Sequence, residues 1–238
     1  MDSMITIHGE RLRIHYTLEG KGTPLILLHG WGQNLEMMKF IADYFQRRFQ
    51  VLNLDLPGFG ESEEPYHAWS LDDYVLFIHE ICVKENLQNP ILVAHSFGAR
   101  IALLYAHKYQ ADKLILTGAA GIKKPKTFSY YAKVYSYKLL KKLRMAPHMG
   151  SEDYKAASDV MKGVLIQSVE RDLSPLLPKI ANETLLVWGE KDQATPLWMG
   201  ETMEKAMPNA TLIVLEDEDH FAYFHQPKRF LAILEYFI

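Results

Sequence analysis

The sequence has very little cysteine, no excess of positive charge and no long hydrophobic run. Among its 238 residues is a single cysteine, Cys82, which cannot form a disulfide within the chain. The chain has 26 Lys and Arg against 29 Asp and Glu, so it lacks the positive field that binds phosphate backbones, and we expect no nucleic-acid partner. No run reaches the roughly 18 apolar residues of a transmembrane segment. The N-terminus also lacks a signal-peptide pattern, so we expect a cytoplasmic location.

The length and composition are typical of one large globular domain, or of one domain that carries an insertion. Apolar residues make up 48% of the chain and charged residues 23%. These proportions allow a full hydrophobic core and exclude a disordered or coiled-coil chain. Two unrelated domains would each have to be small to fit within this length.

Short apolar runs alternate with segments of helical periodicity along most of the chain. At the N-terminus, the alternating segments Ile5 to His8 and Leu12 to Thr17 flank Gly9-Glu10, which predicts an antiparallel hairpin. Buried strands are then expected at 24–28, 51–55, 91–94, 114–117, 184–188 and 212–215. Helices are expected at 35–47, 71–86, 99–109, 197–207 and 227–237. This alternation predicts an α/β fold with a parallel sheet that helices cover on both faces.

The segment 122–182 interrupts this alternation, because it shows helical patterns and no convincing buried strand. We therefore expect a core of residues 1–121 and 183–238, with 122–182 as a helical cap. Residues 121–150 contain eight basic side chains and no acidic one. An apolar stripe at helical spacing is expected at Phe128, Tyr131, Tyr135 and Leu139. The basic side chains either form a solvated face or attract an anionic acyl substrate or an anionic lipid surface.

Ser96 occupies a turn between an expected strand and an expected helix. The small residues Ala94 and Gly98 lie two positions before and after it. A nucleophile elbow needs small residues at both positions, because its turn is sharp and strained so that the hydroxyl stands clear of the sheet. The usual pattern is G-x-S-x-G, and this chain has Ala at its first position. The alternative interpretation is an ordinary serine N-cap of a helix.

A glycine-rich loop, His29-Gly30-Trp31-Gly32, follows the expected strand at 24–28. A nucleophilic serine that attacks a carbonyl needs at least two N–H donors for the developing oxyanion. We expect these donors to be the backbone N–H groups of Trp31 and Phe97, with His29 and Gly30 as the supporting loop. A tight strand-to-helix connection is the alternative reason for Gly32.

An acid and a base follow the serine along the chain. Asp192 lies just past the expected strand at 184–188, with Glu190 as its local competitor. His220 follows the last expected strand, where it opens the final helix, and His225 is the alternative base. The order Ser96, Asp192, His220 is one of the known chain orders of a catalytic triad.

Together these segments resemble the α/β-hydrolase family. The resemblance rests on the motifs HGWG, DLPGFGES, AHSFGA, WGEKDQATP and DHFAYFHQP, in that order, and covers nearly the whole chain. It implies a mostly parallel eight-stranded sheet with helices on both faces and a helical cap inserted after strand 6. The chain departs from the family pattern at Ala94 and at Asp219, where members often have Gly. Family members that open epoxides or displace halide use a carboxylate where this chain has Ser96.

We therefore expect a serine hydrolase that forms an acyl-enzyme on Ser96. Its substrate would be a small or medium carboxylic ester, a thioester, a lactone or an activated C–C bond. An acyltransferase or lyase with the same triad remains open, as does a ligand-binding protein without turnover. We expect no cofactor and no metal, because Gly58-Phe59-Gly60 has Glu63 in place of the third glycine of a dinucleotide site, and no metal-ligand spacing occurs. The oligomeric state is not predicted.

Overall fold

The computed structural model describes residues 1–123 and 152–238. The expected stripe from Phe128 to Leu139, and the basic residues of the segment 121–150 other than Lys123, lie outside the described residues. None of the helices in the described ranges is long and apolar enough to cross a bilayer.

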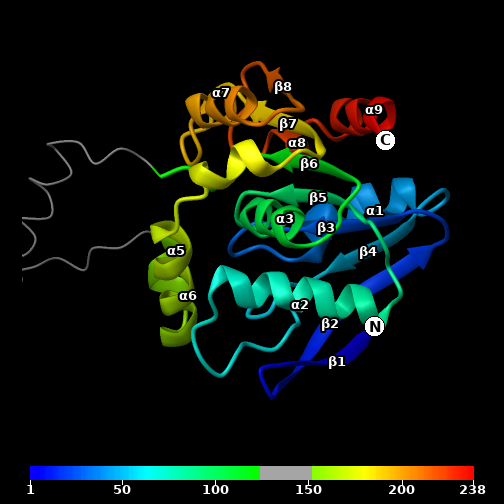
Figure 1. Ribbon diagram of the computed structural model, residues 1–238, viewed down its shortest axis with the longest axis vertical. Helices are drawn as coiled ribbons and strands as arrows, with labels where there is room; N and C mark the ends of the chain where they lie inside the picture. The colour runs from blue at the N-terminus through cyan, green and yellow to red at the C-terminus, as the bar shows by residue number, and fades with distance from the viewer. Residues whose placement is uncertain (124–151) are drawn as a thin grey trace, which may run out of the picture.

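The described residues form an eight-stranded sheet in the order β1-β2-β4-β3-β5-β6-β7-β8 (Figure 1). The strands β1 and β2 pair antiparallel, β2 pairs antiparallel with β4, and all other pairs are parallel. The strands are β1 Asp2–Ile7, β2 Glu10–Gly20, β3 Pro24–Leu28, β4 Gln50–Leu54, β5 Ile91–His95, β6 Lys113–Thr117, β7 Glu183–Gly189 and β8 Ala210–Leu215. The expected fold class, a mostly parallel α/β sheet, is confirmed.

The N-terminal hairpin turns one residue earlier than its sequence predicts. Ile7 pairs with Glu10, so the two-residue loop is His8-Gly9 and not Gly9-Glu10. Both loop residues have positive φ, 49° and 84°. A loop of this kind matches the twist of the flanking strands, and Gly9 adopts it without steric cost.

Helices cover both faces of the sheet. Along β3, Ile26 and Leu28 join one buried cluster, and Leu25 and Leu27 join the other, as expected for a strand buried on both sides. The first cluster includes residues of α2 (Leu71–Lys84), α3 (Phe97–Lys108) and α7 (Leu197–Ala206). The second includes residues of α1 (Lys39–Phe45), α8 (Ala222–His225) and α9 (Pro227–Phe237). The helix expected at 35–47 is a 3₁₀ turn, η1 (Leu35–Met38), followed by α1.

Between β6 and β7, the described part of the chain contains two helices and a 3₁₀ segment. These are α5 (Glu152–Ala156), α6 (Asp159–Glu170) and η2 (Ser174–Lys179). Figure 1 shows α5 and α6 beyond the carboxyl ends of the parallel strands. Loops that follow parallel strands open at this edge, and ligands of α/β proteins bind there.

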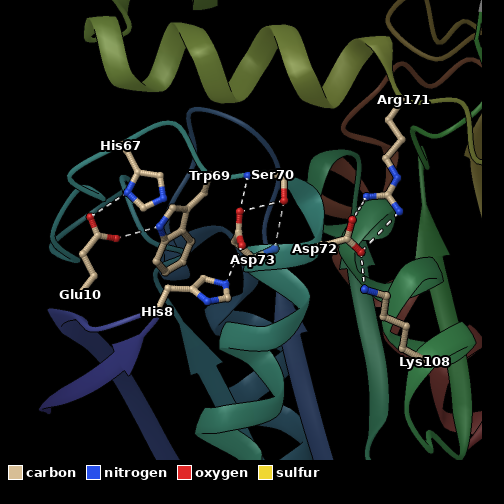
Figure 2. A network of polar contacts seen from close by, with 9 residues as sticks. All are labelled: His8, Glu10, His67, Trp69, Ser70, Asp72, Asp73, Lys108 and Arg171. Carbon is tan, nitrogen blue, oxygen red and sulfur yellow. Dashed lines mark hydrogen bonds and ion pairs between the residues drawn. The ribbon is translucent and has the colours of Figure 1, made fainter.

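An ion-pair cluster ties the end of α6 to the core (Figure 2). Arg171, the C-cap of α6, and Lys108 of α3 both contact the carboxylate of Asp72 in the first turn of α2. Burial acts to raise the pKa of Asp72, but the contacts with Arg171 and Lys108 outweigh it and hold this pKa below its ordinary value. The ionised Asp72 therefore links α2, α3 and α6.

Candidate active site

Ser96 lies on a strained turn between β5 and α3. Its φ of 48° and ψ of −104° fall outside the usual regions for a residue with a Cβ. The Ser96 N–H donates to Thr117 O at 3.1 Å, and the side chain makes no capping hydrogen bond to α3. A Cβ at Gly98 would lie 2.4 Å from Leu28 O and 2.7 Å from His29 O. The backbone geometry agrees with the predicted elbow rather than with an N-cap serine.

The structure brings Asp192 and His220 together. His220 Nδ1 lies 2.7 Å from Asp192 Oδ2, and the Asp192 side chain is completely buried. The backbone N–H of Thr195 donates to Asp192 Oδ1 at 2.8 Å, and Thr195 Oγ lies 2.8 Å from Oδ2. An Nδ1–H that donates to the carboxylate leaves Nε2 of the imidazole free to accept a proton.

Burial acts to raise the pKa of the Asp192 carboxyl, because it disfavours the charged form. The hydrogen bonds from His220 and Thr195 outweigh this effect, so the pKa lies below its ordinary value. Asp192 is therefore ionised at neutral pH and can hold the His220 ring in one orientation.

The two alternatives from the sequence lie elsewhere. Glu190 is exposed, and its carboxylate accepts the N–H of Asp217 at 3.1 Å. His225 ends α8, and its Nδ1 lies 3.2 Å from Glu218. Neither side chain hydrogen-bonds to Asp192, as far as the described residues show.

Three side chains with metal-ligand chemistry gather near the end of α8. Ligand atoms of Glu218, Asp219 and His225 lie within 4.8 Å of one another. His225 pairs with both carboxylates, at 3.2 Å and 3.4 Å. An exposed acidic group of this kind does not by itself define a metal site.

His29 holds the glycine-rich loop in place. Its ring is fully buried, with Nδ1 2.7 Å from Gly30 O and Nε2 accepting the N–H of Leu56 at 3.0 Å. Burial lowers the pKa of His29 to about 4, so the ring is neutral and donates through Nδ1. Because a trans peptide directs its C=O and N–H to opposite sides, the bond to Gly30 O turns the Trp31 N–H away from His29.

The aromatic rings of Trp31, Phe59 and Phe97 pack together beside the elbow. The ring centroid of Trp31 lies 4.9 Å from that of Phe59 and 5.3 Å from that of Phe97. Phe97 is the first residue of α3, so its N–H has no partner within the helix. In the described part of the chain, the N–H groups of Trp31 and Phe97 donate to no other group. Both are therefore free to bind an anionic oxygen.

A cavity of about 680 Å³ opens between the Ser96 turn and α6. It is lined by Trp31, Ser96, Phe97, Arg100 and Thr195, with residues of α6 on the opposite side. His220 is not part of this lining, and among the described residues it makes no hydrogen bond to Ser96. The serine–histidine contact of hydrolases is commonly loose in the free enzyme and tightens when substrate binds.

The sequence did not indicate three residues that surround His220. Thr195 Oγ lies 3.0 Å from Gly118 O, which links the Asp192 loop to the end of β6. A Cβ at Gly118 would lie 3.0 Å from His220 Nδ1. The buried ring of His95 lies 4.6 Å from that of His220. In the sequence, the only local signals of these residues were that Gly118 directly follows an expected strand and that His95 directly precedes Ser96.

These features define an α/β protein with a strained serine turn and a carboxylate–histidine pair. The chain belongs to the alpha/beta hydrolase family, whose model matches residues 25–233. It is 24% identical over 249 residues to the AB hydrolase superfamily protein YisY of Bacillus subtilis, over 92% of each chain. It is also 24% identical over 247 residues to pimeloyl-[acyl-carrier protein] methyl ester esterase of Vibrio vulnificus, over 91% of this chain and 94% of that one.

Solved structures show the same fold. The esterase EaEST from Exiguobacterium antarcticum superimposes with a TM-score of 0.80 at 24% identity, over 100% of this chain and 99% of the esterase. A thermophilic esterase from Thermogutta terrifontis superimposes with a TM-score of 0.79 at 22% identity, over 100% of this chain and 98% of the esterase. At these identities the likeness shows the fold alone.

Proposed function

We propose that this protein is a serine hydrolase that cleaves a small or medium carboxylic ester, thioester, lactone or activated C–C bond through an acyl-enzyme on Ser96. The observation that carries the proposal is the 2.7 Å contact between His220 Nδ1 and the buried Asp192 carboxylate. This pair follows β7 and β8, at the same edge of the sheet where the strained Ser96 follows β5. Membership of the hydrolase family and the esterases among its relatives support an ester as substrate.

In the first step His220 Nε2 takes the proton of the Ser96 hydroxyl while Oγ bonds to the carbonyl carbon. The oxygen that becomes negative accepts hydrogen bonds from the Trp31 and Phe97 N–H groups. The bond to the leaving group then breaks, and His220 returns the proton to that group. Water attacks the acyl-enzyme by the same route, and the acid leaves. Asp192 stays ionised throughout and stabilises the imidazolium.

The cavity supports a substrate of limited size. Its volume of about 680 Å³ is in the range of pockets that bury a small organic molecule. The chemistry needs only groups of this chain and water, so we propose no cofactor.

A fluorophosphonate probe and a panel of esters, thioesters and lactones test this proposal. We expect the probe to label the wild type on Ser96 and to leave Ser96→Ala unlabelled. Ser174→Ala, a matched serine outside the cavity, should be labelled like the wild type. A wild-type protein that neither reacts with the probe nor turns over any member of the panel would support the ligand-binding alternative instead. Acyl transfer to an added alcohol in preference to water would identify an acyltransferase.

A further inference from the structure

Arg100 is a buried cation in the cavity wall. It lies on α3 one helical turn after Ser96, lines the cavity and is only 8% exposed. Its Nη1 donates to Ser168 O at 2.7 Å and to Arg171 O at 3.1 Å. Burial lowers the pKa of Arg100 to about 10, so the guanidinium keeps its charge at neutral pH.

No carboxylate of the described residues contacts this charge directly, although the charge of Asp172 acts on it through space and favours the protonated form. Within residues 1–123 and 152–238, no Asp or Glu forms an ion pair with Arg100. The two carbonyl oxygens it contacts belong to the C-terminal end of α6, where the helix carries only a partial negative charge. A buried guanidinium has five N–H donors in a planar fork, and the two contacts to α6 use only Nη1. The remaining donors have no hydrogen-bond partner among the described residues and can bind an anion.

Ser168 adds an unsatisfied hydroxyl to the same wall. The residue is 1% exposed and lines the cavity, and its Oγ has no hydrogen-bond partner in the described part of the chain. Buried hydroxyl groups are nearly always hydrogen-bonded, because leaving one unpaired costs free energy. The backbone carbonyl of Ser168 contacts Arg100, so the free hydroxyl and the cation belong to one place in the cavity.

The other described charged groups of the cavity wall differ from Arg100 because they are exposed to water. Asp153 and Glu170 are exposed, and Lys123 Nζ donates to the carbonyl of Glu170 at 3.0 Å. Water screens exposed charges, whereas a buried charge keeps most of its strength. Among the described charged residues that line the cavity, Arg100 is therefore the one whose charge water screens least.

We propose that Arg100 and Ser168 form a carboxylate-binding subsite, so that the preferred substrate is an ester whose acyl part carries a second, free carboxylate. The proposal rests on the serine hydrolase function proposed above and names its substrate class. A guanidinium binds a carboxylate through paired N–H donors, and the Ser168 hydroxyl supplies a further one. Because Arg100 follows Ser96 by one turn of α3, we place the carboxylate on the acyl side, as in a monoester of a short dicarboxylic acid.

Matched methyl esters test this subsite. Monomethyl and dimethyl esters of succinic, glutaric and adipic acid differ only in the free carboxylate, and methanol release reports their kcat/KM. We expect the wild type to prefer at least one monoester over its diester. Arg100→Gln should lower that preference roughly ten- to hundred-fold, mainly through KM. The proposal would be overturned if the wild type preferred every diester. It would also be overturned if Arg100→Gln lowered kcat/KM equally for the monoester and the diester.

Two further variants separate binding from cap docking. Arg171→Gln removes a contact between α6 and Asp72 that lies outside the cavity lining, and it should keep the wild-type preference. Loss of the preference in Arg171→Gln as large as in Arg100→Gln would assign the effect to cap docking and refute the subsite. Ser168→Ala removes no side-chain hydrogen bond that the described residues show and should fold normally. Its ester preference therefore tests the subsite even if Arg100→Gln is unstable. We expect it to weaken the preference several-fold, and an unchanged preference would overturn the role of Ser168.

Calorimetry with glutarate distinguishes failure of the subsite from failure of the proposed function. Glutarate should bind to Ser96→Ala and not to the double variant that also carries Arg100→Gln. Binding without hydrolysis of any ester would refute the hydrolase and retain the subsite. Hydrolysis of neutral esters without glutarate binding would refute the subsite and retain the hydrolase.

Discussion

Acidification should destabilise this protein well above the pH at which its carboxylates titrate, because burial makes two histidines much harder to protonate in the folded state than in the unfolded chain. His29 and His95 are completely buried. Burial lowers the pKa of His29 to about 4 and that of His95 to about 3, the latter with a smaller contribution from the nearby His220. In the unfolded chain both rings titrate near the ordinary value of about 6.5.

The sign and size of the effect follow from these pKa values. Below pH 6.5 the unfolded chain binds protons that the folded protein excludes, so the stability falls with pH until the folded rings titrate. At pH 5.0 each ring lowers the free energy of unfolding by about 2 kcal/mol relative to pH 7.5, and the two rings together lower it by about 4 kcal/mol. The Asp192 carboxyl has a lowered pKa, so its contribution is present above about pH 3.9 and is lost only at more acidic pH.

Urea unfolding at pH 7.5 and 5.0, followed by the fluorescence of the buried Trp69 and Trp188, measures the effect. His29→Gln should be less stable than the wild type at pH 7.5, because it disturbs the bonds to Gly30 and Leu56. Between pH 7.5 and 5.0, however, the free energy of unfolding of His29→Gln should fall by about 2 kcal/mol less than that of the wild type, since glutamine does not titrate.

An exposed histidine provides the control. His107→Gln, on the solvent side of α3, should follow the wild-type pH dependence. Equal losses for the wild type and His29→Gln would refute the reasoning, because they would mean that the buried ring accepts a proton in the folded state.

Five substitutions test the proposed active site and its elbow. Ser96→Ala should lower kcat/KM on the order of 10⁴-fold without lowering the melting temperature, since the hydroxyl makes no capping hydrogen bond to α3 that would be lost. His220→Ala should cause a similar loss, whereas His225→Ala should stay within a few-fold of wild type in the same assay; the reverse ranking would make His225 the base. Asp192→Asn should reduce kcat by several orders of magnitude at unchanged KM, because an amide favours the wrong imidazole tautomer. Gly98→Ala should lower the free energy of unfolding, measured by urea denaturation, by several kcal/mol, because the added Cβ would lie 2.4 Å from a backbone oxygen. A variant as stable as the wild type would contradict this clash.

Much of the fold follows from local patterns. The apolar runs predicted the strands because a strand buried on both faces needs consecutive apolar residues. The alternation with helical segments predicted the parallel sheet, since parallel strands need crossover connections. The hairpin prediction was wrong by one residue, because His8 takes a positive φ that the sequence does not reveal.

The candidate site was predictable to the extent that its residues follow strands. Ser96, Asp192 and His220 each lie in a loop after a strand of the sheet, and the carboxyl ends of parallel strands meet at one edge. The partners of these residues were not predictable in the same way. Thr195 reaches Gly118 across 77 positions, and Arg100 reaches Ser168 across 68, and no local pattern reports contacts between such distant elements.

The sequence by itself therefore determined the strand–helix alternation, the small residues around Ser96 and the order of the candidate groups. These features depend on neighbouring residues, whose spacing sets backbone conformation and which face is buried. Only the tertiary structure decided that His220 contacts Asp192 rather than Glu190, and that a buried arginine faces the cavity. Such pairings depend on how separate elements pack, because packing sets the distances between side chains that are remote in sequence.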